Sequence, residues 1–147
     1  MGKKRIVKKT AEEILKEGES AEKHFQFEVK AKPIQEGKIY IASTYNNTIL
    51  TLTDKNGNVL FWTSAGRVGF KNTKKGTPYA ASKAAEVMAE AVKKLKIGEL
   101  QVLIKGVGAG RESALRSLVA RDLNIVSIKD ITPIPHDGCR PPKVRRV

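Results

Sequence analysis

Residues 39–63 read IYIASTYNNTILTLTDKNGNVLFWT, and this stretch decides the fold. Asn46-Asn47 interrupts it once, and because Asn tolerates positive φ, a tight hairpin turn is expected there. Asn56-Gly57, the strongest short hairpin signal, interrupts it a second time. The runs between these turns are rich in β-branched and aromatic residues, as strands are: 39–45, 48–53 and 59–63. The stretch predicts three consecutive antiparallel strands.

The following residues predict two helices alternating with two strands. Thr77-Pro78 has the form of an N-cap followed by proline at the first helical position, and Gly98 is the expected C-terminal stop. Between them the apolar residues recur every three or four positions: Ala81, Ala85, Met88, Val92 and Leu95. Downstream we expect a strand, a glycine-rich bend, a second helix and a last strand: 100–104, 106–110, 112–122 and 125–131. The order strand-strand-strand-helix-strand-helix-strand predicts an α/β domain with a mixed sheet.

The 147 residues divide into three parts around this single domain. Residues 1–36 are expected to form a partly flexible N-terminal extension, with a short helix from Thr10 to Gly18 and a weak strand signal at Phe25, Phe27 and Val29. Residues 37–134 are expected to form the folded α/β domain. Residues 135–147 are the basic C-terminal tail.

The positive charge of the chain is concentrated in three stretches. Lys and Arg number 28 against 15 Asp and Glu, a formal net charge of +13. Fourteen of the 28 lie in stretches without any acid: Lys3–Lys9, Thr63–Lys83 and Gly138–Val147. A near-neutral body with localised basic segments indicates a protein that binds a polyanion.

Several classes of protein are excluded. No apolar run approaches the roughly 20 residues that a membrane span needs. Cys139 is the single cysteine, which fits a reducing, cytoplasmic location. His136, Asp137 and Cys139 fall short of a four-ligand zinc set, and no carboxylate cluster or activated nucleophile is visible. We therefore expect no metal, no cofactor and no catalytic activity.

The glycine bend Lys105–Arg111 leaves three interpretations open. Glycines at a strand-to-helix junction let backbone N–H groups approach a phosphate, with Arg111 as a bidentate donor. In the first interpretation, this phosphate belongs to the backbone of a bound nucleic acid. In the second, the protein is a nucleotide- or nucleic-acid-processing enzyme and the phosphate belongs to its substrate. The bend lacks the lysine and the serine or threonine of a P-loop. A tight turn without any ligand is the third interpretation.

Aromatic residues make up only 5% of the chain, so base stacking on a row of rings is not expected. Phe61, Trp62, Phe70 and Tyr79 are interpreted as core or loop anchors. Lys and Arg contacts to phosphate position a protein on folded RNA without reading its sequence. A DNA-bound regulator would need a base-reading helix, and residues 78–96 are instead Ala-rich with mixed charge on the outer face.

The tail DITPIPHDGCRPPKVRRV, residues 130–147, resembles the C-terminal signature of the universal small-subunit ribosomal protein eleven family, in its bacterial or organellar form. Three further stretches agree in the family's order: STYNNT at 43–48, GFKNTKKGTPYAA at 69–81 and KGVGAGRE at 105–112. The resemblance covers about residues 37–147.

This resemblance implies a three-layer α/β/α domain of ribonuclease-H-like shape, without that enzyme's carboxylates. It implies a structural place on the platform of the small ribosomal subunit, near the mRNA exit region. The implied partners are small-subunit ribosomal RNA, nearby mRNA, and the sixth, eighteenth and twenty-first proteins of the small subunit.

The expected RNA-binding residues lie on the first hairpin turn, the basic loop, the second helix with its glycine bend, and the tail. Asn46 and Asn47 are candidates for contacts to ribose or base, although a pure turn role fits them equally. Eight members are expected to hold RNA phosphates: Lys71, Lys74, Lys75, Arg111, Arg140, Lys143, Arg145 and Arg146. Three more are expected to bind RNA: Arg67, Arg116 and His136.

Overall fold

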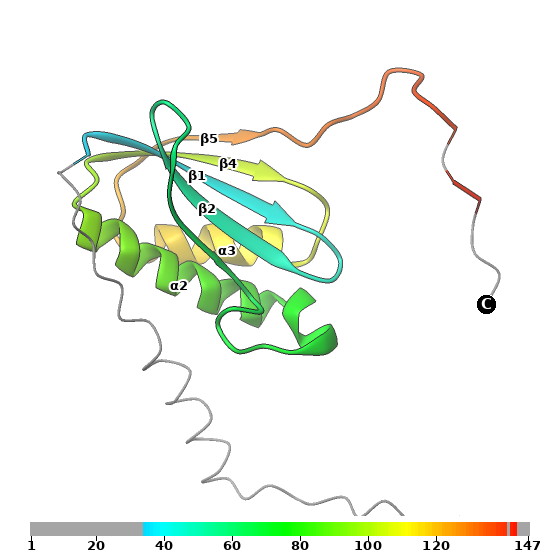
Figure 1. Ribbon diagram of the computed structural model, residues 1–147, viewed down its shortest axis with the longest axis horizontal. Coiled ribbons are helices and arrows are strands. Elements are labelled where there is room, and N and C mark those ends of the chain that lie inside the picture. The colour runs from blue at the N-terminus through cyan, green and yellow to red at the C-terminus, as the bar shows by residue number, and fades with distance from the viewer. Residues whose placement is uncertain (1–33, 141, 144–147) are drawn as a thin grey trace, which may run out of the picture.

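The computed structural model describes residues 34–140, 142 and 143 (Figure 1). Along the chain they form β1 Glu36–Ser43, β2 Thr48–Asp54, β3 Val59–Ser64, the 3-10 helix η1 Asn72–Gly76, α2 Pro78–Leu95, β4 Glu99–Lys105, α3 Gly110–Val119 and β5 Ile125–Asp130. The predicted order of strands and helices is confirmed, and η1 is an addition within the expected loop. The expected helix and strand of the N-terminal extension lie outside the described residues, and the three-part division stays a prediction.

The five strands form one mixed sheet in the order β3-β2-β1-β4-β5. The pairs β1/β2 and β2/β3 are antiparallel, whereas β1/β4 and β4/β5 are parallel. In the centre, Ile41 of β1 lies opposite Leu50 of β2 on one side and Ile104 of β4 on the other. The carboxyl ends of β1 and β4 therefore lie together at one edge of the sheet.

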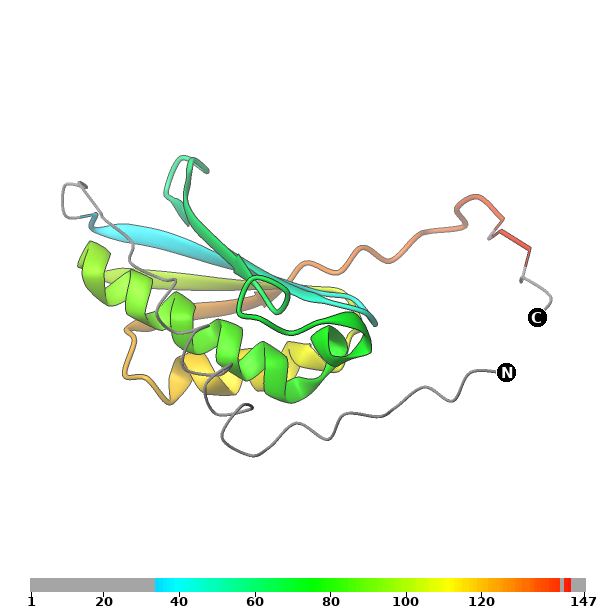
Figure 2. The same cartoon turned by 60° about the horizontal axis from the view of Figure 1, so that its bottom comes forward.

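Both helices cover the same face of this sheet, as Figure 2 shows. Alternate residues of β1, among them Ile39 and Ile41, are fully buried in one core that also contains Met88 of α2 and Leu118 of α3. The expected three layers are therefore corrected to two for the described residues. The reason lies in the connections: β3-α2-β4 and β4-α3-β5 cross the sheet in the same direction, and right-handed crossovers then place both helices on one face. The ribonuclease-H-like shape stays a prediction.

The predicted start of α2 is confirmed and its predicted end is not. Thr77 accepts a hydrogen bond from the backbone N–H of Ala80 at 3.3 Å, and Pro78 is the first helical residue. At the other end the left-handed residue is Lys96, with φ 51°, instead of Gly98. Gly98 instead allows a close approach to the preceding segment of the chain, because a Cβ there would lie 3.0 Å from the carbonyl oxygen of Gln35. Among the described residues no helix is long and apolar enough to cross a bilayer.

Both predicted hairpins are present, but their turns differ from expectation in one respect. The β2–β3 turn has Gly57 at φ 96°, as the Asn-Gly signal predicts. In the β1–β2 turn, neither Asn46 nor Asn47 has positive φ. Thr44 closes that turn instead: its backbone N–H and its hydroxyl both donate to the carbonyl of Asn47, at 2.9 and 3.1 Å.

Candidate nucleic-acid interface

Three loops that are distant in sequence meet at the carboxyl ends of β1 and β4. The β1–β2 turn lies between the end of η1 and the glycine bend. A Cβ on Gly76 would clash with the carbonyl oxygen of Tyr45, and a Cβ on Gly108 would clash with that of Thr44. Glycine is needed at both positions because backbone approaches backbone there. The loops are therefore packed together as one surface, which we call the loop end of the domain.

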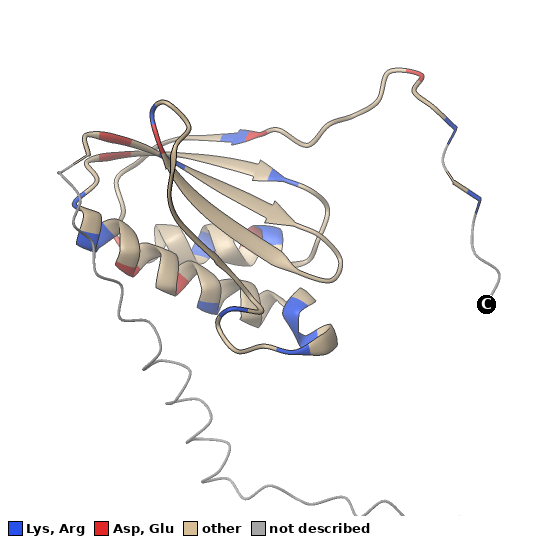
Figure 3. Cartoon of the chain, viewed as in Figure 1, with Lys and Arg blue, Asp and Glu red and all other residues tan. Residues whose placement is uncertain are grey.

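The loop end carries three lysines that have no ion-pair partner among the described residues. Lys71 and Lys74 are exposed, and Lys75 is half-buried with its stem against Gly66. Within the described part of the chain none of the three lysines has an ion-pair partner. Figure 3 shows basic residues on η1. The acidic residues Glu36 and Glu99 begin β1 and β4, at the end of the sheet away from the loop end. This polarity favours an anionic ligand at the loop end.

Two backbone N–H groups of the glycine bend, and that of the residue after it, donate within the chain. The N–H of Gly106 donates to the hydroxyl of Thr132 at 3.0 Å, and that of Gly108 donates to the carbonyl of Ser43 at 3.1 Å. The N–H of Arg111, at the start of α3, donates to the carbonyl of Gly108 at 3.2 Å. Gly106 itself has φ 97°, which favours glycine. These bonds support the interpretation as a tight turn.

Arg111 connects the bend to the end of β5. Its guanidinium donates to the carbonyl of Gly106 at 3.1 Å and to the carboxylate of Asp130. Hydrogen bonds from Thr132, followed by those from Arg111, hold the pKa of the Asp130 carboxyl well below its ordinary value of 3.8. The Asp130 carboxylate offsets the charge of Arg111 and would compete with a phosphate for its guanidinium. The phosphate contact of Arg111 therefore stays a prediction.

The other predicted residues are spread over the surface. Asn46 is exposed at the loop end, whereas the side-chain oxygen of Asn47 is buried without a hydrogen-bond partner among the described atoms. Arg116 lies on α3, where Glu112 pairs with it at 3.3 Å. The tail leaves the body after β5 (Figure 1), and its described predicted residues are exposed: His136, Arg140 and Lys143. Arg145 and Arg146 lie outside the described residues.

The interpretation of Trp62 from the sequence is wrong. Trp62 was expected to be a core or loop anchor, but it is 49% exposed on the sheet face that the helices leave open. Phe61 is buried in the core, as expected. Phe70 packs edge-on against Tyr79 with centroids 5.8 Å apart, and Tyr79 is itself 65% exposed. The strand alternation contained the signal: if Phe61 points to the core, Trp62 points away from it.

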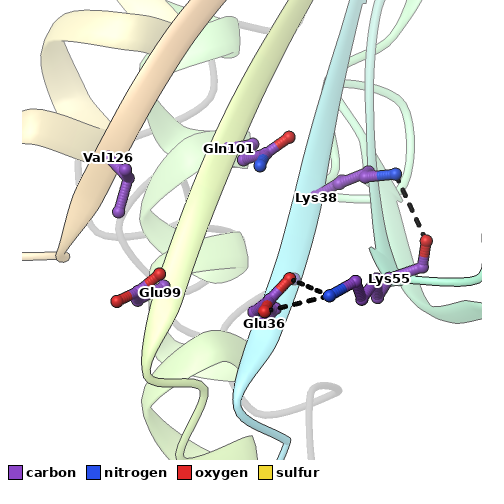
Figure 4. A pocket seen from close by; sticks show the side chains of 7 residues that line it. Glu36, Lys38, Lys55, Glu99, Gln101 and Val126 are labelled. Atoms are coloured by element: carbon purple, nitrogen blue, oxygen red, sulfur yellow. Dashed lines mark hydrogen bonds and ion pairs between the residues drawn. The ribbon is translucent and has the colours of Figure 1, made fainter.

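A small hollow lies at the other end of the sheet, where β1 and β4 begin (Figure 4). Its volume is about 30 Å³, enough for one or two water molecules. The ammonium of Lys55 pairs with Glu36 at 3.1 Å, and Lys38 donates to the carbonyl of Lys55 at 3.2 Å. The hollow is thus lined by an ion pair whose two charges offset each other. Within the described ranges no three His, Cys, Asp or Glu side chains are grouped closely enough to hold a metal ion.

The domain has two layers, loop-end lysines without ion-pair partners among the described residues, and a basic tail. These features are typical of the class of polyanion-binding proteins. The family of ribosomal protein S11 matches residues 37–146. The chain therefore belongs to the ribosomal protein S11 family, whose members are structural, rRNA-binding proteins of the small ribosomal subunit. The resemblance seen in the sequence is confirmed, and with it a location in the ribosome.

Proposed function

We propose that this protein holds small-subunit rRNA on the platform, near the mRNA exit region, through Lys and Arg contacts to phosphates. The observation that carries the proposal is the loop end, where the packing of three loops presents lysines without ion-pair partners among the described residues. The exposed tail would extend the contact to RNA beyond the body. Its protein neighbours would be the sixth, eighteenth and twenty-first proteins of the subunit, and it would have no catalytic activity, in a cytoplasmic ribosome.

Neutralising two loop-end lysines tests this proposal. In K71Q/K74Q the exposed stems remain while two charges are lost. The control K93Q/K94Q removes two exposed charges at the far end of α2. Each phosphate contact contributes about 0.9 to the slope of log K against log salt concentration. For small-subunit rRNA we expect the slope of K71Q/K74Q to fall by roughly 1.8 in filter binding, and that of the control to stay unchanged. Equal losses in both variants would place the interface elsewhere.

A further inference from the structure

The open face of the sheet carries an exposed tryptophan beside the basic loop. In the register, Trp62 of β3 lies opposite Thr51 of β2, which lies opposite Tyr40 of β1. Trp62 is 49% exposed and its neighbour on the same face, Ile49, is 41% exposed. None of the described helices covers this face (Figure 2).

Arg67 holds one side of this indole. Its guanidinium carbon lies 4.7 Å from the centroid of the Trp62 ring, and one guanidinium nitrogen donates to the backbone carbonyl of Trp62 at 2.9 Å. The backbone N–H of Arg67 donates to the hydroxyl of Ser64 at 3.2 Å. These contacts fix a cation against an exposed aromatic ring, an arrangement worth more when a ligand removes water from it.

The Trp62–Arg67 pair is continuous with the phosphate-binding surface proposed above. Gly66 follows β3, and a Cβ added there would lie 3.3 Å from the stem of Lys75, so the loop beside Arg67 lies close to η1. No acidic residue occurs between Thr63 and Lys83. A strand of RNA whose phosphates follow these lysines would bring its bases to the edge of the open face.

We propose that Trp62, backed by Arg67, stacks on an unpaired base of the bound RNA. This inference rests on the proposed function and adds a base contact to it. The partner is identified by its chemistry: the cation favours an anionic chain, and a base has a flat π surface that an indole can cover regardless of its sequence. A single stack needs no row of aromatic residues, so the low aromatic content of the chain does not exclude it.

The fluorescence of Trp62 tests the inference directly, because it is the single tryptophan of the chain. A labelled oligoadenylate of about ten nucleotides, within the usual range of site sizes, is titrated into the full-length protein. Anisotropy of the label reports binding, and tryptophan emission reports stacking. We expect saturable quenching that follows the anisotropy. Heparin, a polyanion without bases, should bind and leave the emission nearly unchanged.

Each outcome separates the inference from the function on which it rests. Binding without quenching, or equal quenching by heparin, overturns the stack and leaves phosphate binding in place. Binding of heparin without binding of the oligoadenylate overturns the stack alone, and absence of binding to either polyanion overturns both.

Two variants sharpen the test. W62F keeps a stacking ring and should retain most of the affinity measured by anisotropy, whereas W62L keeps apolar area without one and should lose roughly 5- to 150-fold. Equal affinities of W62F and W62L would contradict stacking, and would leave the open face to an apolar protein partner. Thermal unfolding of both variants confirms that the fold is intact.

Discussion

At the scale of single residues, the structure assigns internal partners to groups that sequence reasoning offered to a ligand. Arg111 was expected at a phosphate, but its guanidinium bonds to Gly106 and Asp130. The N–H groups of Gly106 and Gly108 are likewise bonded to Thr132 and Ser43. Hydrogen bonds of this kind depend on segments that come together only in the fold, so neither composition nor spacing predicts them.

The Asp130 carboxylate should stabilise the protein at neutral pH and lose this effect in acid. Its pKa is lower in the folded state than its ordinary 3.8, so the folded state favours the ionised form. The stabilisation is fully present above about pH 4 and is lost as the pH falls further. We expect D130N to lower the melting temperature at pH 7, and the difference from the parent protein to shrink below pH 4.

The control for this prediction is E112Q, which removes an exposed carboxylate paired with Arg116 at 3.3 Å. Exposed pairs of this type contribute about 0–1 kcal/mol, so little change is expected. A D130N effect that persists unchanged at pH 3 would contradict the assignment.

At the scale of elements, backbone contacts hold the three loops together. The basic loop was expected from its composition, but η1 within it was not, and its last residue, Gly76, lies against the carbonyl of Tyr45. This contact joins a segment after β3 to the turn after β1. It determines where Lys71 and Lys74 lie relative to the β1–β2 turn.

Two alanine substitutions in the same loop should therefore differ. A Cβ on Gly76 meets backbone atoms that cannot move freely, so G76A should cost about 1–3 kcal/mol of unfolding free energy, as overpacking does. A Cβ on Gly66 meets the flexible stem of Lys75 at 3.3 Å and the Ser64 hydroxyl at an ordinary 3.9 Å, so G66A should stay within about 0.5 kcal/mol. Urea unfolding measures both. If G66A were as damaging as G76A, the backbone contact would not be the cause.

At the scale of the whole molecule, positive charge extends away from a compact body. Acidic residues begin β1 and β4, the loop end is basic, and the tail leaves the body beyond β5 (Figure 3). The described tail residues after Thr132 are exposed. This arrangement fits the proposed function, because the body and the tail could contact separate stretches of phosphate backbone.

Truncation after Asp137 should separate folding from RNA binding. The missing ten residues contain four basic residues and, where described, make no contact with the core. We expect an unchanged melting temperature, a salt slope for small-subunit rRNA reduced by up to about 3.6, and poor incorporation into small subunits. A full-length variant with the four basic tail residues changed to Gln is the matched control and should behave alike. Incorporation of the truncated chain at the level of the full-length chain would refute the role of the tail.

The sequence by itself determined the five strands, the two helices, the N-cap at Thr77, the hairpin at Asn56-Gly57, the family and the polyanionic partner. These depend on periodicity, on caps and on charge runs, which are interactions between near neighbours in the chain. Only the tertiary structure decided that both helices share one face, that Trp62 is exposed beside Arg67, and that Arg111 is bound to Asp130. Those facts depend on the strand order and on the direction in which each crossover passes over the sheet, and they bring together residues far apart in sequence.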